Sequence, residues 1–569
     1  MKRFGTMITL SSMLAISALL PACSNNAPSN EASKSSSAST GSSESSATAT
    51  ASNASSETAP TGLPAKFDPP VEMSYVSYQF ATLKYDKGDD VNNNNWTRML
   101  KDEYGIVAKN VWEVPYAQYP QKTDLMIASG DIPDFFLASP TQLKQLYEAD
   151  MIEDLTDVYN KYAPELVRKV QDAAGEYPRK AATIDGKLMG IPFTGVLRES
   201  VNGLWVRMDW IKKLGLPEPK TLEDFLTIAD AFANKDPDGN NKKDTIGLGL
   251  DKDLAMTAPF MNMLHAYKSI WTKDADGKLV YSSTQPAMKE ALVKLHDLYA
   301  KGILDKEFVV KDVTKLFEDV TANKVGMFYS AGTAGAYPLQ GSKDNDPNVE
   351  WKMFPLPAYD DEPGKFQTEL DIFHGFWVVK KGFKHPEALL RIQEQWLANF
   401  YFNNSDETHQ KFVSNADNDT IWMESPAKLY MPTRNRDFYL LVNDVLSGKA
   451  DKSTVPPGVR DILGMIEKYK AGDNQFWGQN LIYGEGGSMG VADHYINENL
   501  YVQNEFIAAP LQVMVDKGVN LTKLELDAFT KIITGNEPIE SFDKFVTNWK
   551  KQGGDDVTKA INEWYTANQ

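Results

Sequence analysis

The loop DPDGNNKKDTIG, which begins at residue 236, has the most explicit chemistry in this chain. Loops of the EF-hand type supply calcium with oxygen ligands at positions 1, 3, 5, 7 and 9, the seventh being a backbone carbonyl. The residues at those positions here are Asp236, Asp238, Asn240, Lys242 and Asp244.

Two other positions of this loop decide how far the resemblance to an EF-hand extends. Asn241 stands at position 6, where the sharp turn requires a residue that tolerates positive φ. Position 12 is Gly247 instead of glutamate, so further ligands must come from elsewhere in the chain or from water. We expect a stand-alone structural calcium loop. The alternative is a metal-free turn, because Pro-Asp-Gly is strong turn chemistry by itself.

The sequence contains one motif typical of hydrolases. Residues 486–490, GGSMG, match G-x-S-x-G, and His494 lies close by. A nucleophile elbow needs a buried strand before it and the acid and then the base downstream. The run before Gly486 is short and glycine-rich instead of a clear core strand, and His494 is too close to Ser488 to follow an intervening acid in the usual order. The six histidines show no zinc-binding spacing. A glycosidase needs two carboxyls at a set separation, which the sequence does not reveal. We therefore expect a protein that is not an enzyme.

The N-terminus has the features of a bacterial export signal. Lys2 and Arg3 precede an apolar run that ends in Leu20-Pro21-Ala22-Cys23. This ending resembles a lipobox, in which the cysteine is diacylated, for example with palmitate, and becomes the new N-terminus. Cys23 is the single cysteine of the chain, and an ordinary signal peptide with an incidental cysteine is the alternative.

The composition of the chain excludes some classes of function and indicates how the chain is divided into segments. The chain has 569 residues, a formal charge of −18 and 42% hydrophobic residues. Such an acidic balance argues against binding to nucleic acid and against electrostatic binding to anionic lipid. Residues 24–66 consist almost entirely of small and polar residues, which predicts a disordered tether. We therefore expect a signal peptide at 1–22, the lipidated cysteine and tether at 23–66, and a folded body at 67–569.

The body alternates between strand and helix patterns. Strands are predicted at 71–80, 107–115 and 134–139, and helices lie between them, ending near Gly105 and Gly130. This alternation predicts an α/β lobe with a largely parallel sheet. Further elements are predicted at 221–232, 274–282, 284–302, 325–330 and 374–382, followed by a helix from Pro386.

Several segments, taken together, resemble a known family. They are ASGDIPDFF, DGKLMGIPFTG, LWVRMDWIKKLGLPEPKTLEDF, the calcium-type loop, FVTNWKKQGGDDVTKAINEWY and the lipobox. In their order and spacing they are similar to the family 1 extracellular solute-binding lipoproteins of ABC importers, in particular to the large oligosaccharide-type subgroup.

The resemblance implies a periplasmic-binding-protein type II fold, with two α/β lobes, hinge strands and a ligand cleft between the lobes. Lobe 1 would comprise about 67–195 and a segment after about 375. Lobe 2 would comprise about 201–370 and part of the C-terminal region. The implied protein is monomeric, extracytoplasmic and anchored to the cell membrane only through its lipidated cysteine.

Aromatic and polar residues near predicted strand ends are candidates for ligand binding, because ligands of open α/β sheets lie beyond the carboxyl ends of strands. For any one aromatic residue, packing in the core is the alternative role. The candidates are Tyr78, Gln79, Asp131, Trp205, Arg207, Tyr329, Trp377, Trp477 and Tyr483.

The function implied is capture of an oligosaccharide by hinge closure and its delivery to an ABC permease. A peptide or other non-sugar solute is one alternative ligand. A non-transport adhesin or sensor ectodomain is an alternative from a different class.

Overall fold

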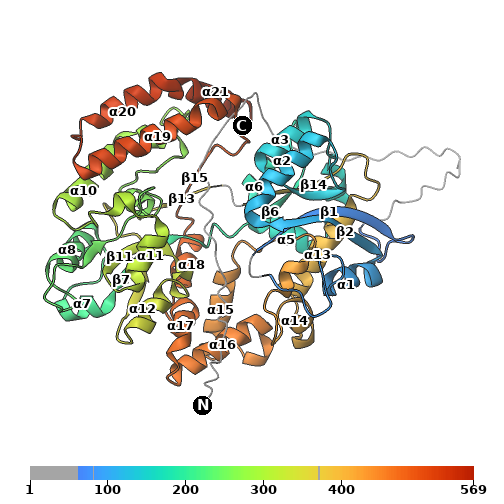
Figure 1. Cartoon of the computed structure of the whole chain (residues 1–569), viewed down its shortest axis with the longest axis horizontal. Coiled ribbons are helices and arrows are strands. Elements are labelled where there is room, and N and C mark those ends of the chain that lie inside the picture. Colours follow the sequence, from blue (N-terminus) through green and yellow to red (C-terminus); the bar gives the residue numbers. More distant parts are fainter. Residues whose placement is uncertain (1–61, 81–82, 370–371, 569) are drawn as a thin grey trace, which may run out of the picture.

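The computed structural model describes residues 62–80, 83–369 and 372–568. Two lobes lie side by side, and the chain crosses between them more than once (Figure 1). The predicted signal peptide, Cys23 and nearly all of the predicted tether lie outside the described residues.

Lobe 1 is built on a five-stranded sheet with the order β2-β1-β3-β14-β6. Strands β2, β1 and β3 are parallel, whereas β14 is antiparallel to both β3 and β6. The strands are β1 (Val71–Gln79), β2 (Ile106–Pro115), β3 (Phe135–Ala138), β6 (Ile191–Thr194) and β14 (Ile372–Val379). A short hairpin, β4 (Thr183–Ile184) and β5 (Lys187–Leu188), precedes β6.

Helices pack around this sheet, and their ends follow local sequence signals. The Asn94 side chain accepts hydrogen bonds from the first-turn amides of α1, and Gly105 ends that helix with φ of 69°. The lobe 1 helices are α1 (Asn95–Tyr104), α2 (Tyr119–Ser129), α3 (Pro140–Glu148), α4 (Thr156–Tyr162), α5 (Glu165–Ala173), α6 (Glu176–Ala181), α13 (Glu387–Phe400) and α14 (Asp406–Phe412).

Lobe 2 contains a four-stranded sheet with the order β12-β7-β11-β8. Its strands are β7 (Asn202–Arg207), β8 (Ile246–Leu248), β11 (Val325–Ala331) and β12 (Trp351–Phe354). Two small sheets join it: β9 (Trp271–Lys273) with β10 (Leu279–Tyr281), and β13 (Phe366–Thr368) with β15 (Tyr501–Gln503).

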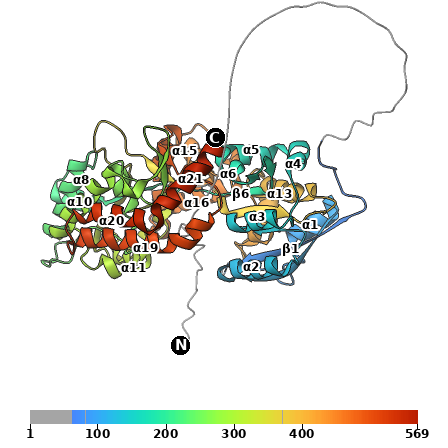
Figure 2. The ribbon, with the colours of Figure 1, turned by 90° about the horizontal axis from the view of Figure 1, so that it is seen from above.

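Helices from the middle and the end of the chain complete lobe 2. Thr221 and Asp224 form the capping box at the start of α8, as the sequence predicts. The C-terminal helices α19, α20 and α21 lie together on one side of this lobe (Figure 2). The lobe 2 helices are α7 (Met208–Leu214), α8 (Leu222–Asn234), α9 (Ala258–Met263), α10 (Pro286–Ala300), α11 (Val313–Thr321), α12 (Leu339–Asn345), α15 (Arg434–Leu446), α16 (Pro457–Lys470), α17 (Trp477–Tyr483), α18 (Met489–Asn497), α19 (Gln512–Thr534), α20 (Ser541–Trp549) and α21 (Asp555–Ala567).

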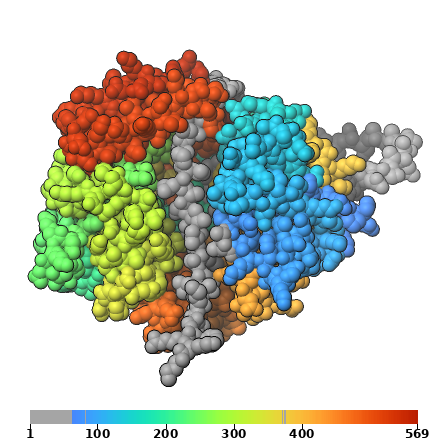
Figure 3. Space-filling model, viewed as in Figure 1, coloured from blue at the N-terminus to red at the C-terminus, as the bar shows by residue number. Residues whose placement is uncertain are grey.

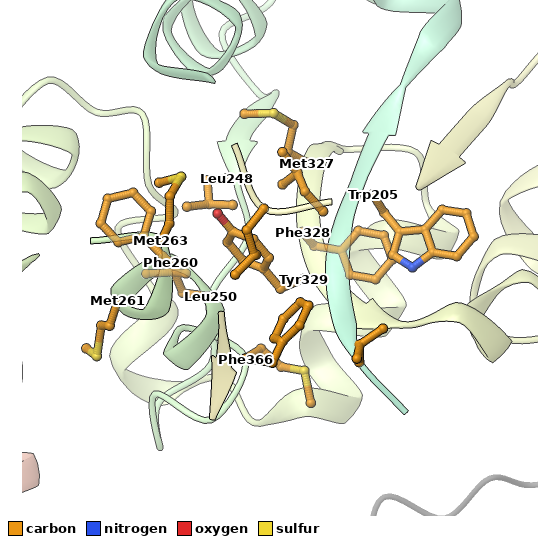
Figure 4. Close-up of a cluster of buried hydrophobic side chains, with 14 of the residues drawn as sticks. Trp205, Leu248, Leu250, Phe260, Met261, Met263, Met327, Phe328, Tyr329 and Phe366 are labelled. Atoms are coloured by element: carbon orange, nitrogen blue, oxygen red, sulfur yellow. The ribbon is translucent and has the colours of Figure 1, made fainter. Parts of the chain in front are cut away.

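Buried hydrophobic side chains form two separate clusters, one in each lobe. The lobe 1 cluster draws its members from 67–193 and 376–429, and the lobe 2 cluster from 201–366 and 442–561. Figure 4 shows the part of the lobe 2 cluster around β7 and β11. The chain therefore passes between the lobes along a first crossover (195–201), a second crossover between β13 and β14, and a third crossover (430–434).

Trp477 and Tyr483, two of the predicted ligand residues, lie at the two ends of a helix, α17, and a glycine-rich segment follows this helix from Gly484. A helix therefore precedes Ser488, whose Oγ is buried and donates a hydrogen bond to the carbonyl of Gly332. Within the described ranges, no helix is both long enough and apolar enough to cross a membrane.

Candidate functional site

A cavity of ≈ 810 Å³ lies where the two lobes meet. Its wall combines the turn from α5 into α6 in lobe 1 with the segment after α9, the β9–β10 hairpin and the paired strands β13 and β15. Figure 3 shows the two lobes as separate masses that face each other. The residues that line the cavity with polar or aromatic side chains include Glu176, Tyr177, Arg198, His265, Tyr267, Lys273, Gln285, Lys365, Thr368, Glu369, Asn499, Tyr501, Gln503 and Glu505.

Tyr177 of lobe 1 faces charged groups of lobe 2. Burial raises the pKa of Tyr177, and the carboxylate of Glu505 raises it further, whereas the ammonium of Lys273 opposes this shift. Lys273 and Glu505 themselves form an ion pair of 3.2 Å. A ring from one lobe therefore lies within electrostatic range of an ion pair on the other.

The first crossover contributes Arg198 to the cavity. The guanidinium carbon of Arg198 lies 5.6 Å from the ring centroid of Tyr501, a cation–π arrangement. The hydroxyl of Tyr501 donates a 2.6 Å hydrogen bond to the carbonyl of Arg198. Because the backbone is also held, the guanidinium is positioned against the β15 side of the cavity.

Glu369 immediately follows β13 and is exposed to the cavity. Its Oε2 accepts a 2.8 Å hydrogen bond from Nδ2 of Asn504. Loss of hydration next to the surrounding protein raises the pKa of the Glu369 carboxyl, and the hydrogen bond from Asn504 acts in the opposite direction. This carboxyl is thus a fixed acceptor at the second crossover.

Glu199, which is 2% exposed, joins the first crossover to the start of α15. One carboxylate oxygen accepts a 2.6 Å hydrogen bond from Nδ2 of Asn435, and the other accepts one of 3.0 Å from the backbone N–H of Arg436. Burial raises the pKa of Glu199 to about 8, against the lowering effect of these hydrogen bonds and of the Arg434 guanidinium. The hydroxyl of Tyr483 donates to Oδ1 of Asn435 at 2.8 Å, which adds α17 to this joint.

Tyr78 lies at the carboxyl end of β1, within a group of aromatic rings. Its ring makes edge contacts with Phe80, Tyr116 and Tyr119 at centroid distances of 5.1–5.5 Å. Burial, followed by the neighbouring hydroxyl of Tyr430, raises the pKa of Tyr78 well above its ordinary value. Gln79 ends the same strand and is half-buried.

The predicted aromatic residues of lobe 2 lie in its core. Trp205 is fully buried on β7, and its Nε1 donates to the carbonyl of Ala331 at 3.2 Å. Tyr329 is fully buried on β11, and its hydroxyl has no hydrogen-bond partner among the described residues. Figure 4 shows both rings within the hydrophobic cluster. Trp477 on α17 is also buried, with the Lys343 ammonium 5.4 Å from its ring.

Three other predicted ligand residues also lie away from the wall of the cavity. Arg207 is buried and makes a bidentate ion pair with Asp209 at 2.7 and 2.9 Å. Trp377 packs in the lobe 1 core, and its Nε1 donates to the carbonyl of Lys428. Asp131 is exposed between α2 and β3. None of the predicted ligand residues lines the cavity as described, and their part in binding stays a prediction.

The calcium-type loop follows α8 and leads into β8. Asp236 and Asn241 both adopt positive φ, and the Asp236 carboxylate accepts hydrogen bonds from the amides of Gly239, Asn240 and Asn241. The Nδ2 atom of Asn240 lies between the carboxylates of Asp238 and Asp244, at 2.7 and 3.1 Å. An electropositive group thus already bridges two of the predicted ligands.

Other observations bear on whether this loop fits calcium. Its side-chain donors are carboxylate and amide oxygens, the hard ligands that calcium prefers. Burial and the neighbouring carboxylates of Asp236 and Asp244 raise the pKa of Asp238, so the acidic groups crowd one another. In the part of the chain that the structure describes, no three His, Cys, Asp or Glu side chains already gather as a metal-holding group. The donor set fits calcium, although closure around an ion requires the Asn240 amide to turn.

Comparison with known families decides the class of protein. A model described as "Bacterial extracellular solute-binding protein" matches residues 96–399, which is more than half of the chain. The chain belongs to this family. The match spans parts of both lobes and the first two crossovers, so it covers the segments that form most of the cavity.

Individual relatives of this solute-binding protein are more distant. The chain is 24% identical to the lipoprotein LipO of Bacillus subtilis (strain 168) over 479 residues, covering 83% of this chain and 89% of LipO. It is 28% identical over 257 residues to FusA of Streptococcus pneumoniae serotype 4 (strain ATCC BAA-334 / TIGR4), a fructooligosaccharide ABC transporter substrate-binding protein. That alignment covers 42% of this chain and 47% of FusA.

Solved structures agree on the fold. FusA in complex with kestose superposes with a TM-score of 0.56 at 18% identity, covering 87% of this chain and 99% of FusA. The alginate-binding protein AlgQ2 without calcium ion superposes with a TM-score of 0.55 at 14% identity, covering 88% of this chain and 98% of AlgQ2. At these identities the likeness establishes the fold alone, and it confirms the predicted two-lobe α/β architecture of a solute-binding protein.

Residue-by-residue reasoning missed the cavity's own side chains. Arg198 lies next to Glu199 in the segment predicted to cross between the lobes, so two adjacent charges in a crossover were an available signal for Arg198. Tyr177 and Tyr501 carried no such signal, because one lies at the start of a short helix and the other on a three-residue strand.

Proposed function

We propose that this chain is the substrate-binding protein of an ABC importer and that it captures an oligosaccharide by closing its two lobes. The observation that carries the proposal is the cavity whose wall comes from both lobes and from two crossovers. A ligand that touches both lobes stabilises the closed arrangement, since it binds that arrangement more tightly than the open one.

The chemistry of the wall supports a sugar ligand. Tyr177, Tyr267 and Tyr501 offer ring faces of the kind on which the C–H faces of sugars pack. Gln285, Asn499 and Gln503 offer amides that both donate and accept hydrogen bonds, as sugar hydroxyls require. The volume of ≈ 810 Å³ lies within the range of about 300–1,000 Å³ usual for ligand pockets. The sequence relative FusA is described as a fructooligosaccharide substrate-binding protein, and this similarity also favours a sugar ligand.

Binding without turnover is part of the proposal. The wall residues hold and orient a ligand through stacking and hydrogen bonds, and the crossovers change conformation as the lobes close. The closed shape would then present surfaces of both lobes to the transmembrane subunits of a permease. We expect the protein to act as a monomer, because one chain supplies both sides of the cavity.

The experiment that tests this function is calorimetric titration of the purified protein with oligosaccharides, together with small-angle X-ray scattering. We expect saturable binding of one ligand per chain and a smaller radius of gyration when ligand is bound. Saturable binding with an unchanged scattering profile would contradict closure, and release of shortened saccharide would contradict binding without turnover.

Calcium belongs to the proposal as a structural ion. Asp236, Asp238, Asn240, Asp244 and the Lys242 carbonyl would hold it, and the ion would neutralise the crowded carboxylates of the loop. We infer a role in stability, because the loop connects α8 to β8 within lobe 2. The carbonyl of Pro237 already accepts a hydrogen bond from Nζ of Lys213, which ties the loop to α7.

Membrane anchoring through acylated Cys23 is likewise proposed. The export signal and the relation to the lipoprotein LipO support it. An extracytoplasmic protein held by its lipid would sediment with membranes, and Cys23→Ser would release it into the soluble fraction. Membrane association that survives Cys23→Ser would contradict the anchor.

A further inference from the structure

The charged groups of the inter-lobe cavity distinguish between two classes of oligosaccharide. Three carboxylates line it, those of Glu176, Glu369 and Glu505. Three cationic side chains also line it, those of Arg198, Lys273 and Lys365. The wall is therefore electrically balanced, within a protein whose formal charge is −18.

Most of these charges already have partners. Lys273 pairs with Glu505 at 3.2 Å, Lys365 with Glu362 at 3.6 Å, and Glu176 with Lys180 at 3.0 Å. His265 also lines the wall, and its Nε2 lies 3.1 Å from the carboxylate of Asp360. These cations are therefore not available to neutralise a charged ligand without loss of an existing ion pair.

Arg198 and Glu369 differ from the rest. Among the described residues, Arg198 has no carboxylate partner, and its polar contact is a 3.4 Å hydrogen bond to Oδ1 of Asn499. Glu369 has no cationic partner within the same residues, and it accepts from Asn504. One lies on the first crossover and the other beside the second, so the cavity offers one unneutralised donor group and one unneutralised acceptor group.

We propose that the ligand is a neutral oligosaccharide, and that Arg198 and Glu369 bind its hydroxyls while Tyr177 and Tyr501 pack against its rings. This inference rests on the proposed function and narrows its substrate class. A uronate oligomer carries one negative charge per residue, so three or four residues would bring several charges to a wall with a single unpaired cation. Those charges would lose hydration without compensation and would be repelled by Glu369.

A neutral sugar avoids that cost. Its hydroxyls can accept from the guanidinium of Arg198 and donate to the carboxylate of Glu369, and hydrogen bonds to charged groups are the stronger kind. Because both charges belong to the crossovers, the contacts would form where the lobes rotate relative to each other. Binding of the sugar hydroxyls would thereby be coupled to the conformation of the crossovers.

The test uses one polysaccharide hydrolysate separated by anion exchange into a neutral and an acidic fraction of matched chain length. The purified protein is incubated with each fraction, its Tm is measured, and the saccharide that remains bound after gel filtration is weighed by mass spectrometry. We expect the neutral fraction to raise Tm and to yield a bound neutral oligosaccharide. A larger shift and a recovered uronate oligomer with the acidic fraction would overturn the inference while leaving the proposed function intact. If neither fraction raises Tm and no saccharide is recovered, the proposed function itself is overturned, and this inference with it.

Variants test the two charged residues. Arg198→Gln and Glu369→Gln are each expected to weaken binding of the recovered neutral saccharide by about tenfold or more, the range for a lost hydrogen bond to a charged group. Lys384→Gln, which removes an exposed charge from the lobe 1 surface, serves as the matched control and should bind as the parent does. The ligand-free Tm of each variant reports folding. Unchanged binding by both folded cavity variants would overturn the assignment.

Discussion

The carboxyl of Glu199 accepts a 2.6 Å hydrogen bond from the side-chain amide of Asn435, and this contact joins the first crossover to the start of α15. Glu199 belongs to the first crossover, and Asn435 stands in the first turn of α15, directly after the third crossover. The second oxygen of Glu199 accepts from the backbone of Arg436. Glu199 therefore forms a buried joint at the start of α15, and any relative motion of the lobes must either preserve these hydrogen bonds or break them.

Removal of this joint should destabilise the protein. Glu199→Ala leaves the amides of Asn435 and Arg436 buried without their acceptor, and each such group costs about 1–3 kcal/mol. We expect chemical denaturation to show a loss of at least the cost of one such group, about 1–3 kcal/mol. The exposed residue Glu467, which pairs with Lys452 on the surface, provides the control Glu467→Ala, for which we expect almost no change. Equal effects of the two variants would contradict the role of the joint.

The same carboxyl predicts a pH dependence of stability. Burial raises the pKa of Glu199 from 4.5 to about 8, and that of Glu424 by a similar amount, with the Asp86 charge adding to the effect of burial on Glu424. The folded chain keeps these protons between about pH 4.5 and 8, where the unfolded chain has lost them. The free energy of unfolding contributed by these groups therefore falls as pH rises through that window.

Glu199→Gln separates this contribution from the others. Glutamine cannot ionise, so the difference in free energy of unfolding between pH 5.5 and pH 8 should be smaller in the variant than in the parent. Urea denaturation at the two pH values provides the measurement. If parent and variant lose stability in parallel between these pH values, Glu199 is ionised throughout and the explanation by burial is wrong.

Calcium should stabilise the protein through the loop between α8 and β8. An ion present at 100 times its dissociation constant adds about 2.7 kcal/mol to the free energy of unfolding. We expect chelator to lower Tm, and Asp238→Asn with Asp244→Asn to abolish the response to added calcium. Asp274→Asn, in the β9–β10 turn, is the control that should keep it. A chelator-insensitive Tm would favour the metal-free turn.

Sequence patterns predicted several of the helices and strands, and the resemblance to solute-binding proteins implied the two lobes. The capping box of Thr221 and Asp224, the left-handed Gly105 and the alternation from β1 to β3 are local, so composition and spacing predict them. The site depends on which distant segments meet. Tyr177, Arg198 and Tyr501 converge only because the crossovers bring α6 and β15 together, and no periodicity within either segment encodes that contact.

Trp205 is a second case in which the sequence did not predict the surroundings of a side chain. It is one of the predicted ligand residues, but it is fully buried on β7, beside β11. We expect Trp205→Ala to cost about 3–5 kcal/mol of stability, as for other large core residues, and to leave ligand affinity unchanged at temperatures where the variant is folded. Lost affinity without lost stability, measured by calorimetry and denaturation on the same sample, would restore Trp205 as a binding residue.

The most direct test of the central claim is the thermal melting of the purified protein against a panel of neutral and acidic oligosaccharides, with each saccharide recovered afterwards. We expect a saturable rise in Tm with at least one oligosaccharide, which is recovered intact. A panel that leaves Tm unchanged, or a saccharide recovered in shortened form, would contradict the claim that this solute-binding protein captures an oligosaccharide without transforming it.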